Sequence, residues 1–169
     1  MREARAAPEE AFWRFSLYFY ELPAVAQALL ALQDRDGLDI NLILFALWFG
    51  ISGRGRLDSD ALTAAERAIG KIRAEIVEPL RSLRRKLKEH PDSDVQRLRE
   101  GIKALELEGE KLVQTRLARF AGSALGEISA EDRRATAVAN LILYLGQDKT
   151  ASAEAAVLRA AIEELVQHR

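Results

Sequence analysis

An acidic turn is the first group of residues whose types and spacing could carry chemistry. Asp34, Asp36 and Asp39 stand close to Asn41 in the run QDRDGLDIN. Three carboxylates and an amide offer the oxygen ligands that Mg²⁺ and Ca²⁺ prefer, although the spacing does not fit an EF-hand loop. The turn therefore predicts a site for a hard cation, and Mg²⁺ or Ca²⁺ is the only cofactor that the sequence suggests.

The same turn also has a purely structural interpretation. Asp39 is a good N-cap for the apolar segment that follows, and Asp36 with Gly37 is typical of a tight turn. Asp34 would then pair with an arginine such as Arg14 or Arg35. Both interpretations stay open at the level of sequence.

Aromatic residues form a second group, because nine of the eleven lie between Phe12 and Phe49. Those that could line a ligand pocket or form the centre of a partner interface are Trp13, Tyr18, Tyr20 and Trp48. The alternative is a core in which the tyrosine hydroxyls reach the surface. Aromatic side chains over 12–20 occupy nearly the whole circumference of one helix, so other helices or another chain must cover some of them.

A basic segment, 71–88, is the third group, with seven cations against Glu75 and Glu78. Four of the cations share one helix face: Arg81, Arg84, Arg85 and Lys88. Such a face can bind the phosphates of a nucleic acid or an anionic lipid surface. No aromatic residue is interleaved to stack on bases, and the alternative is a solvated face that neighbouring carboxylates neutralise.

Most catalytic classes lack their usual groups in this sequence. There is no cysteine, and the two histidines are His90, which precedes a proline, and His168, which is penultimate. These facts exclude a thiol nucleophile and leave little room for a multi-histidine metal site. No serine lies in a nucleophile-elbow motif. The sequence favours a protein that is not an enzyme.

Composition and periodicity define the scaffold that must position these groups. The chain has 169 residues, 49% of them apolar, and a net charge of −1, which fits one domain over 1–169 with a buried core. The near-neutral total hides a net negative charge over 1–50 and a net positive charge over 51–100. The longest apolar run, 42–51, is about half of the roughly 20 residues that a membrane helix needs. No signal peptide is visible, so we expect a cytoplasmic protein without membrane insertion.

Helical periodicity runs through nearly every segment and predicts an all-α bundle of about six to seven helices. Segment 40–51 is apolar almost all round and is expected at the centre of the core. Segment 59–120 is expected to form a long antiparallel hairpin, with a kink or a helix junction near Pro79. Ser93 with Gln96 reads as a capping box for its second arm. Residues 1–8 are expected to be a flexible N-terminus.

The N-terminal third also carries a recognisable pattern. The stretches FWRFSL (12–17) and LQDRDGLDINLILF (32–45), followed by Trp48, resemble an uncharacterised proteobacterial family of small helical proteins that carry a domain of unknown function. The resemblance is sharp over about 12–49 and looser beyond. It implies a bacterial, cytoplasmic, single-domain protein and no particular activity.

These observations lead to three hypotheses of function. The first is a non-enzymatic helical interaction or adaptor protein, expected as a homodimer, because aromatic residues abound where catalytic groups do not. The second is a small-ligand binder or Mg²⁺-type enzyme that uses the acidic turn beside an aromatic pocket. The third is nucleic-acid binding through the basic face over 81–88.

Overall fold

The computed structural model describes residues 7–122 and 129–167, and over these residues the chain is helical with short connections. Its helices are α1 (Pro8–Glu21), α2 (Val25–Asp36), α3 (Ile40–Ile51), α4 (Ser59–Ile72), α5 (Glu78–Lys86), α6 (Ser93–Phe120), α7 (Ala130–Leu145) and α8 (Ala153–Gln167). A π-helical segment, η1 (Arg73–Val77), joins α4 to α5, and a short 3₁₀ segment, η2 (Gln147–Lys149), follows α7. Because α4, η1 and α5 run on as one helix, the described residues form seven helices. The predicted all-α, single-domain bundle is confirmed.

Helix α3 lies at the centre of the core, as its composition predicts. Every residue from Leu42 to Trp48 is buried, since α1, α2, α6 and α7 all pack around it. Phe12 of α1 stacks on Trp48 with the ring centroids 4.8 Å apart. On another side α7 approaches so closely that a Cβ atom on Gly50 would lie 2.4 Å from the Cα atom of Ala137. This contact needs a residue without a side chain.

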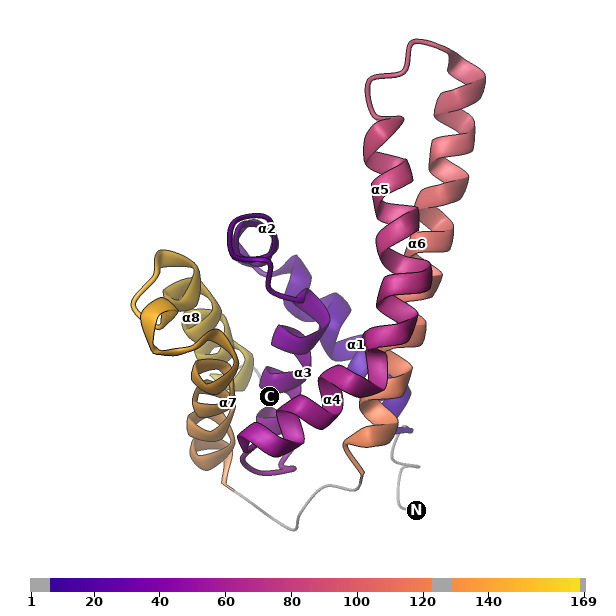
Figure 1. Ribbon diagram of the computed structural model, residues 1–169. Helices are drawn as coiled ribbons and strands as arrows, with labels where there is room; N and C mark the ends of the chain where they lie inside the picture. Colours follow the sequence, from indigo (N-terminus) through magenta and orange to yellow (C-terminus); the bar gives the residue numbers. More distant parts are fainter. Residues whose placement is uncertain (1–6, 123–128, 168–169) are drawn as a thin grey trace, which may run out of the picture.

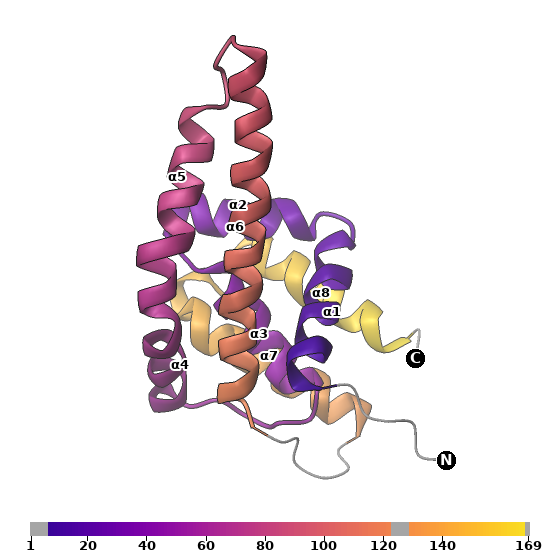
Figure 2. The same ribbon diagram turned by 90° about the vertical axis from the view of Figure 1, so that its right-hand side faces the viewer.

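The predicted hairpin is present, and its two arms are antiparallel (Figure 1). The first arm is the continuous helix α4–η1–α5, and α6 returns beside it. Two segments meet at Glu78, with Pro79 at the beginning of α5, as the proline indicates. Both views show that the tip of the hairpin extends well beyond the other helices (Figures 1 and 2). The hairpin therefore presents long stretches of helix surface that the rest of the described chain does not cover.

The predicted N-cap of α3 is confirmed, and the predicted capping box of α6 is wrong. Asp39 accepts a hydrogen bond from the Leu42 amide (3.1 Å), and Ser129 accepts one from the Asp132 amide (3.1 Å). For α6, however, the N-cap is Asp92 rather than Ser93, with the Asp94 amide 2.8 Å from its Oδ1. Gln96 does not complete a capping box, because its Nε2 donates to the carbonyls of 87 and 90 and so closes the hairpin turn.

Two further expectations concern the N-terminus and the membrane. Residues 1–6 of the predicted flexible segment 1–8 lie outside the described residues, and Pro8 already belongs to α1. In the part of the chain that is described, no single helix is both long and apolar enough to cross a bilayer. Helices α1 and α2 would meet that requirement only together, and they are bent by 99° relative to one another.

Candidate functional site

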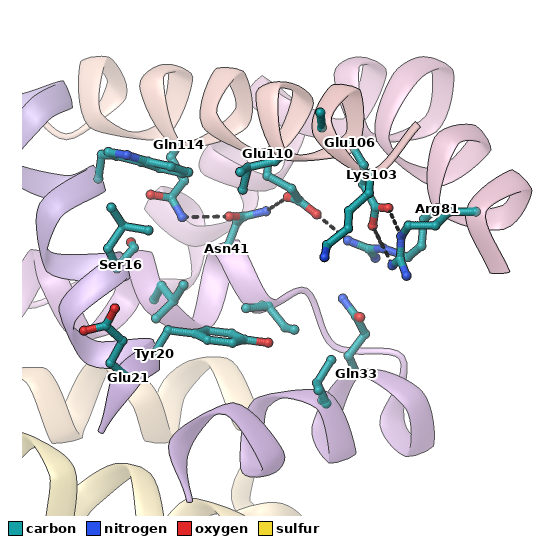
Figure 3. A pocket seen from close by; sticks show the side chains of 18 of the residues that line it. Ser16, Tyr20, Glu21, Gln33, Asn41, Arg81, Lys103, Glu106, Glu110 and Gln114 are labelled. Carbon is teal, nitrogen blue, oxygen red and sulfur yellow. Dashed lines mark hydrogen bonds and ion pairs between the residues drawn. The ribbon is translucent and has the colours of Figure 1, made fainter. Parts of the chain in front are cut away.

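A cavity of about 730 Å³ lies between the hairpin and the N-terminal helices (Figure 3). Helices α1, α2 and α3 supply one side and α5 and α6 the other. The side chains that line it are Trp13, Ser16, Leu17, Tyr20, Glu21, Leu30, Gln33, Ile40, Asn41, Leu44, Arg81, Arg84, Arg85, Glu100, Lys103, Ala104, Glu106, Leu107, Glu110 and Gln114. A volume of this size falls within the usual range for small-molecule sites.

One end of the cavity is a cluster of ion pairs between the two arms of the hairpin. Glu106 and Glu110 are one turn apart on α6, and Arg81 and Arg84 are one turn apart on α5. Arg81 bonds both carboxylates, with Nε 3.2 Å from Glu106 Oε1 and Nη2 on Glu110 Oε1. Arg84 donates to both oxygens of Glu106, one of them at 3.1 Å from its Nη2. The helical spacing on each arm aligns these four groups.

The cluster continues into a chain of amides. Asn41, at the beginning of α3, donates from its Nδ2 to Glu110 Oε2. Gln114, one further turn along α6, donates from its Nε2 to Asn41 Oδ1 at 3.0 Å. Because the Glu110 carboxylate accepts, the amide of Asn41 must present its nitrogen to it and its oxygen to Gln114. The orientation of Gln114 follows, and its Oε1 is directed away from Asn41.

Two buried polar atoms at this end have no hydrogen-bond partner among the described residues. They are Ser16 Oγ and Gln114 Oε1, on side chains that line the cavity. Ser16 and Gln114 are only 5% and 4% exposed. Figure 3 shows them at one end of the cavity and Arg81 at the other. A buried acceptor without a partner costs about 1–3 kcal/mol, so a group that satisfied it would be held with a corresponding gain.

Burial and charge shift the two glutamates in opposite directions. Burial raises the pKa of Glu110 above its ordinary value of 4.5, and the hydrogen bond from Asn41 and the charge of Arg81 only partly offset it. Burial also acts to raise the pKa of Glu106, but the hydrogen bonds from Arg84 and Arg81 outweigh it, and the net shift is downward. Burial similarly raises the pKa of the Tyr20 phenol, which lies across the cavity.

The structure separates the four predicted aromatic candidates. Trp13 and Tyr20 line the cavity. Trp48 is 2% exposed and lies in the core, with the guanidinium of Arg54 4.0 Å from its ring centroid. Tyr18 is half exposed on the outside of α1. The four aromatic candidates therefore lie in three places: the cavity, the core and the outer surface.

The three aspartates of the acidic turn are not brought together. Asp34 pairs with Arg85 of the hairpin at 2.8 Å, rather than with Arg14 or Arg35. Asp36 pairs with Arg35, which also bonds Glu154 of α8. Asp39 caps α3 and pairs with the Nε of Arg73 at 2.6 Å. Over the described ranges, no three His, Cys, Asp or Glu side chains lie close enough together to hold a metal ion.

The basic face is largely engaged within the fold. Arg81 and Arg84 are directed toward the glutamates of α6, and Arg85 bonds Asp34. Lys88 lies at the end of the hairpin, 4.0 Å from Glu89. The net negative stretch 1–50 and the net positive stretch 51–100 thus form ion pairs with each other within one chain. Nucleic-acid binding through this face stays a prediction.

The carboxylates of α6 and the amide of Gln114 were not among the candidates that the sequence predicts, although Arg81, Arg84 and Arg85 of the same cavity were. One signal was available, because Asn41 is the one strongly polar residue in the apolar segment 40–51. Glu106, Glu110 and Gln114 follow one another at intervals of four along α6. A polar row of this kind is equally typical of a solvent-exposed helix face. Only the packing of α3 against it shows that it is enclosed.

The fold and the cavity define an all-α single-domain protein with a polar network along the cavity between its hairpin and its N-terminal helices. A family model described as a protein of unknown function, DUF2390, matches residues 11–117. The chain belongs to this family, and the match extends well beyond the stretch 12–49 that carries the sequence resemblance. It covers every residue that lines the cavity. No curated protein and no solved structure matches the chain.

Proposed function

We propose that this protein binds a small, mainly apolar molecule that carries a hydrogen-bond donor, and that it holds this molecule in the cavity between the hairpin and helices α1–α3. The observation that carries the proposal is the buried Oε1 atom of Gln114, a residue of the cavity lining, because this atom has no partner in the described structure. An amide oxygen accepts hydrogen bonds and cannot donate them. The matching ligand group is therefore a hydroxyl, an amine or a primary or secondary amide.

The rest of the lining argues for an apolar, uncharged body. Trp13, Leu17, Leu44 and Leu107 supply apolar surface from three helices. The charged lining residues are four cations and four carboxylates: Arg81, Arg84, Arg85, Lys103, Glu21, Glu100, Glu106 and Glu110. Because these charges balance, the cavity as a whole gives no electrostatic preference for an anion or a cation. Ser16 Oγ, which can donate or accept, is a second unpartnered polar atom at the same end of the cavity.

The proposal is tested with a pair of probes that differ in one hydrogen-bond donor. We expect 1-octanol to change the fluorescence of Trp13 saturably and to bind roughly tenfold more tightly than octyl methyl ether, which has the oxygen but no donor. Trp48 is in the core and contributes a constant background. Equal affinity for the two probes, or no saturable signal, would contradict the proposal.

Variants assign the effect to the cavity. Gln114→Leu should abolish the preference for the alcohol, whereas Gln27→Leu, the same exchange on the exposed surface of α2, should retain it. If Gln114→Leu is too unstable to measure, Leu107→Trp provides a second route. Leu107 is 53% exposed at the cavity and tolerates a larger side chain, which should weaken the binding of both probes.

We propose an interaction or adaptor role as the second candidate function, supported by the exposed apolar residues of the hairpin. Leu83 of α5 and Leu98 of α6 are 45% and 60% exposed, one on each arm of the hairpin. Large apolar side chains gathered on an exposed surface are typical of partner sites. Replacing both by Ser should reduce the recovery of any co-purifying partner. The bacterial, cytoplasmic setting stays a prediction that cell fractionation with a tagged chain would check.

A further inference from the structure

Helix α6 carries an apolar row on its outer face, away from the cavity. Leu98, Leu105 and Leu112 follow one another at intervals of seven and are 60%, 59% and 40% exposed. A spacing of seven keeps side chains on one face of a helix. The adjoining face, with Ile102, Gly109 and Val113, is buried against the first arm of the hairpin and α3. In Figure 2, α6 lies toward the viewer along the whole hairpin, and no labelled helix covers it.

A glycine within this row has no explanation inside the described chain. Gly101 lies in the middle of α6 between Leu98 and Leu105, and a Cβ atom added to it would meet nothing within 4 Å. Glycine in a helix interior costs about 1 kcal/mol relative to alanine. Gly109, by contrast, is where Val77 packs, 3.2 Å from the position of a Cβ atom. The smooth surface at Gly101 allows a second helix to come close.

The charges on this face identify the second helix as α6 of another copy. If two α6 helices lie antiparallel with a two-fold axis at Leu105, then Leu98 faces Leu112 of the second copy. On the same face, Asp94 then faces Arg116 of the second copy, and this pair occurs twice by symmetry. A parallel arrangement would place Asp94 against Asp94 and Arg116 against Arg116. Asp94 now pairs with Arg97, and because both side chains are largely exposed, this pair can be replaced at little cost.

We propose that this chain forms an antiparallel homodimer through the outer face of α6, centred on Leu105. The three leucines supply the apolar seam, and Gly101 allows the close approach. The two Asp94–Arg116 pairs fix the direction of the helices. The seam lies on the opposite side of α6 from Lys103, which lines the cavity, so the dimer leaves the cavity open. The proposal is therefore independent of the ligand-binding function.

Light scattering during size-exclusion chromatography of the full chain tests the dimer. We expect a dimer at micromolar concentrations and at least a tenfold increase in the dissociation constant for Leu105→Glu. Leu107→Glu is the matched control, because Leu107 is equally exposed on the same helix but faces the cavity, and it should leave the dimer intact. A wild-type chain that is monomeric at 100 µM or more would overturn the proposal.

Cross-linking tests the direction and does not depend on the glutamate variant. The chain has no cysteine, so every disulfide that forms must join two introduced cysteines. We expect disulfides between a Leu98→Cys chain and a Leu112→Cys chain when the two are mixed. A Leu105→Cys chain should also pair with itself. Disulfides that join Leu98→Cys only to Leu98→Cys would show a parallel dimer and contradict the two-fold axis at Leu105.

Discussion

The arginines of the hairpin illustrate how a residue's neighbours decide its role. Arg81 and Arg84 share a face with Arg85, and the sequence alone treats all three alike. In the structure Arg81 and Arg84 are about a quarter exposed and bond to the buried Glu106, and Arg81 also bonds the partly buried Glu110. Arg85 is 54% exposed and bonds an exposed aspartate. Buried ion pairs are costly to break, because the remaining charge is left without compensation.

This difference predicts unequal effects of the same substitution. Arg81→Met should lower the free energy of unfolding by about 3 kcal/mol, because it leaves Glu110 and part of Glu106 unpaired. Arg85→Met removes an exposed pair and should cost less than about 1 kcal/mol. Urea unfolding followed by circular dichroism measures both. Similar losses for the two variants would show that the cluster is solvated rather than enclosed.

The opposite pKa shifts of the two glutamates predict opposite effects of pH. The pKa of Glu110 is raised in the folded state, so its contribution to stability is present below its ordinary value of 4.5 and is lost as the pH rises through the folded pKa. The pKa of Glu106 is lowered, so its contribution is present above 4.5 and is lost as the pH falls through the folded pKa.

Subtracting the stability of a neutral variant from that of the wild type isolates each contribution. The difference from Glu110→Gln should decrease as the pH rises above 4.5, and the difference from Glu106→Gln should decrease as the pH falls below it. Thermal unfolding at intervals from pH 3 to pH 8 gives both curves. Slopes of the same sign would mean that the two carboxylates share one environment.

Among the elements, the helices were predictable and their contacts were not. The apolar composition of α3 indicates a central position, and Asp39 marks its beginning within one residue. Nothing in the sequence shows that Gly50 is the point where α7 comes closest. Asn140 of α7 is a similar case, because its side chain accepts from the Leu57 amide (2.9 Å) and donates to two carbonyls, and so fastens the connection between α3 and α4. These contacts depend on pairings between distant segments, which periodicity does not encode.

The close approach of α3 and α7 predicts a strong effect from one methyl group. Gly50→Ala should destabilise the protein by about 3 kcal/mol, because the clash is with the backbone of Ala137 and no side chain can move aside. Gly70→Ala, within α4, should instead stabilise it by about 1 kcal/mol, since a Cβ atom there meets nothing within 4 Å. The midpoints of urea unfolding compare the two.

At the scale of the whole molecule, the hydrophobic core includes residues that lie beyond the region matched by the family model. The match ends at residue 117, yet Ala137, Leu141 and Leu145 of α7 are buried in the same core cluster as α3. The helices that line the cavity therefore depend on a segment outside the match. Residues 1–50 carry a net negative charge and residues 51–100 a net positive charge. The ion pairs of Asp34 and Asp39 with arginines of the hairpin join the N-terminal helices to it.

This dependence predicts the behaviour of a shortened chain. A fragment ending at residue 122 should lose its cooperative unfolding transition, because removing α7 and α8 exposes one side of the apolar helix α3. Circular dichroism during urea titration checks it. A fragment that unfolds cooperatively at a denaturant concentration near that of the full chain would show that the matched region is a domain by itself.

The π-helical segment η1 has a consequence for how this chain can change over time. A π turn holds one residue more than an α turn, and each residue in an α-helix advances the side chains by about 100°. Loss of a single codon within 73–77 would straighten the helix without breaking it. Because four α-helical residues turn the chain about as far as five π-helical ones, Arg81 and Arg84 would still face Glu106 and Glu110. Relatives with one residue fewer in this segment are thus expected to keep the two arginines and the two glutamates paired.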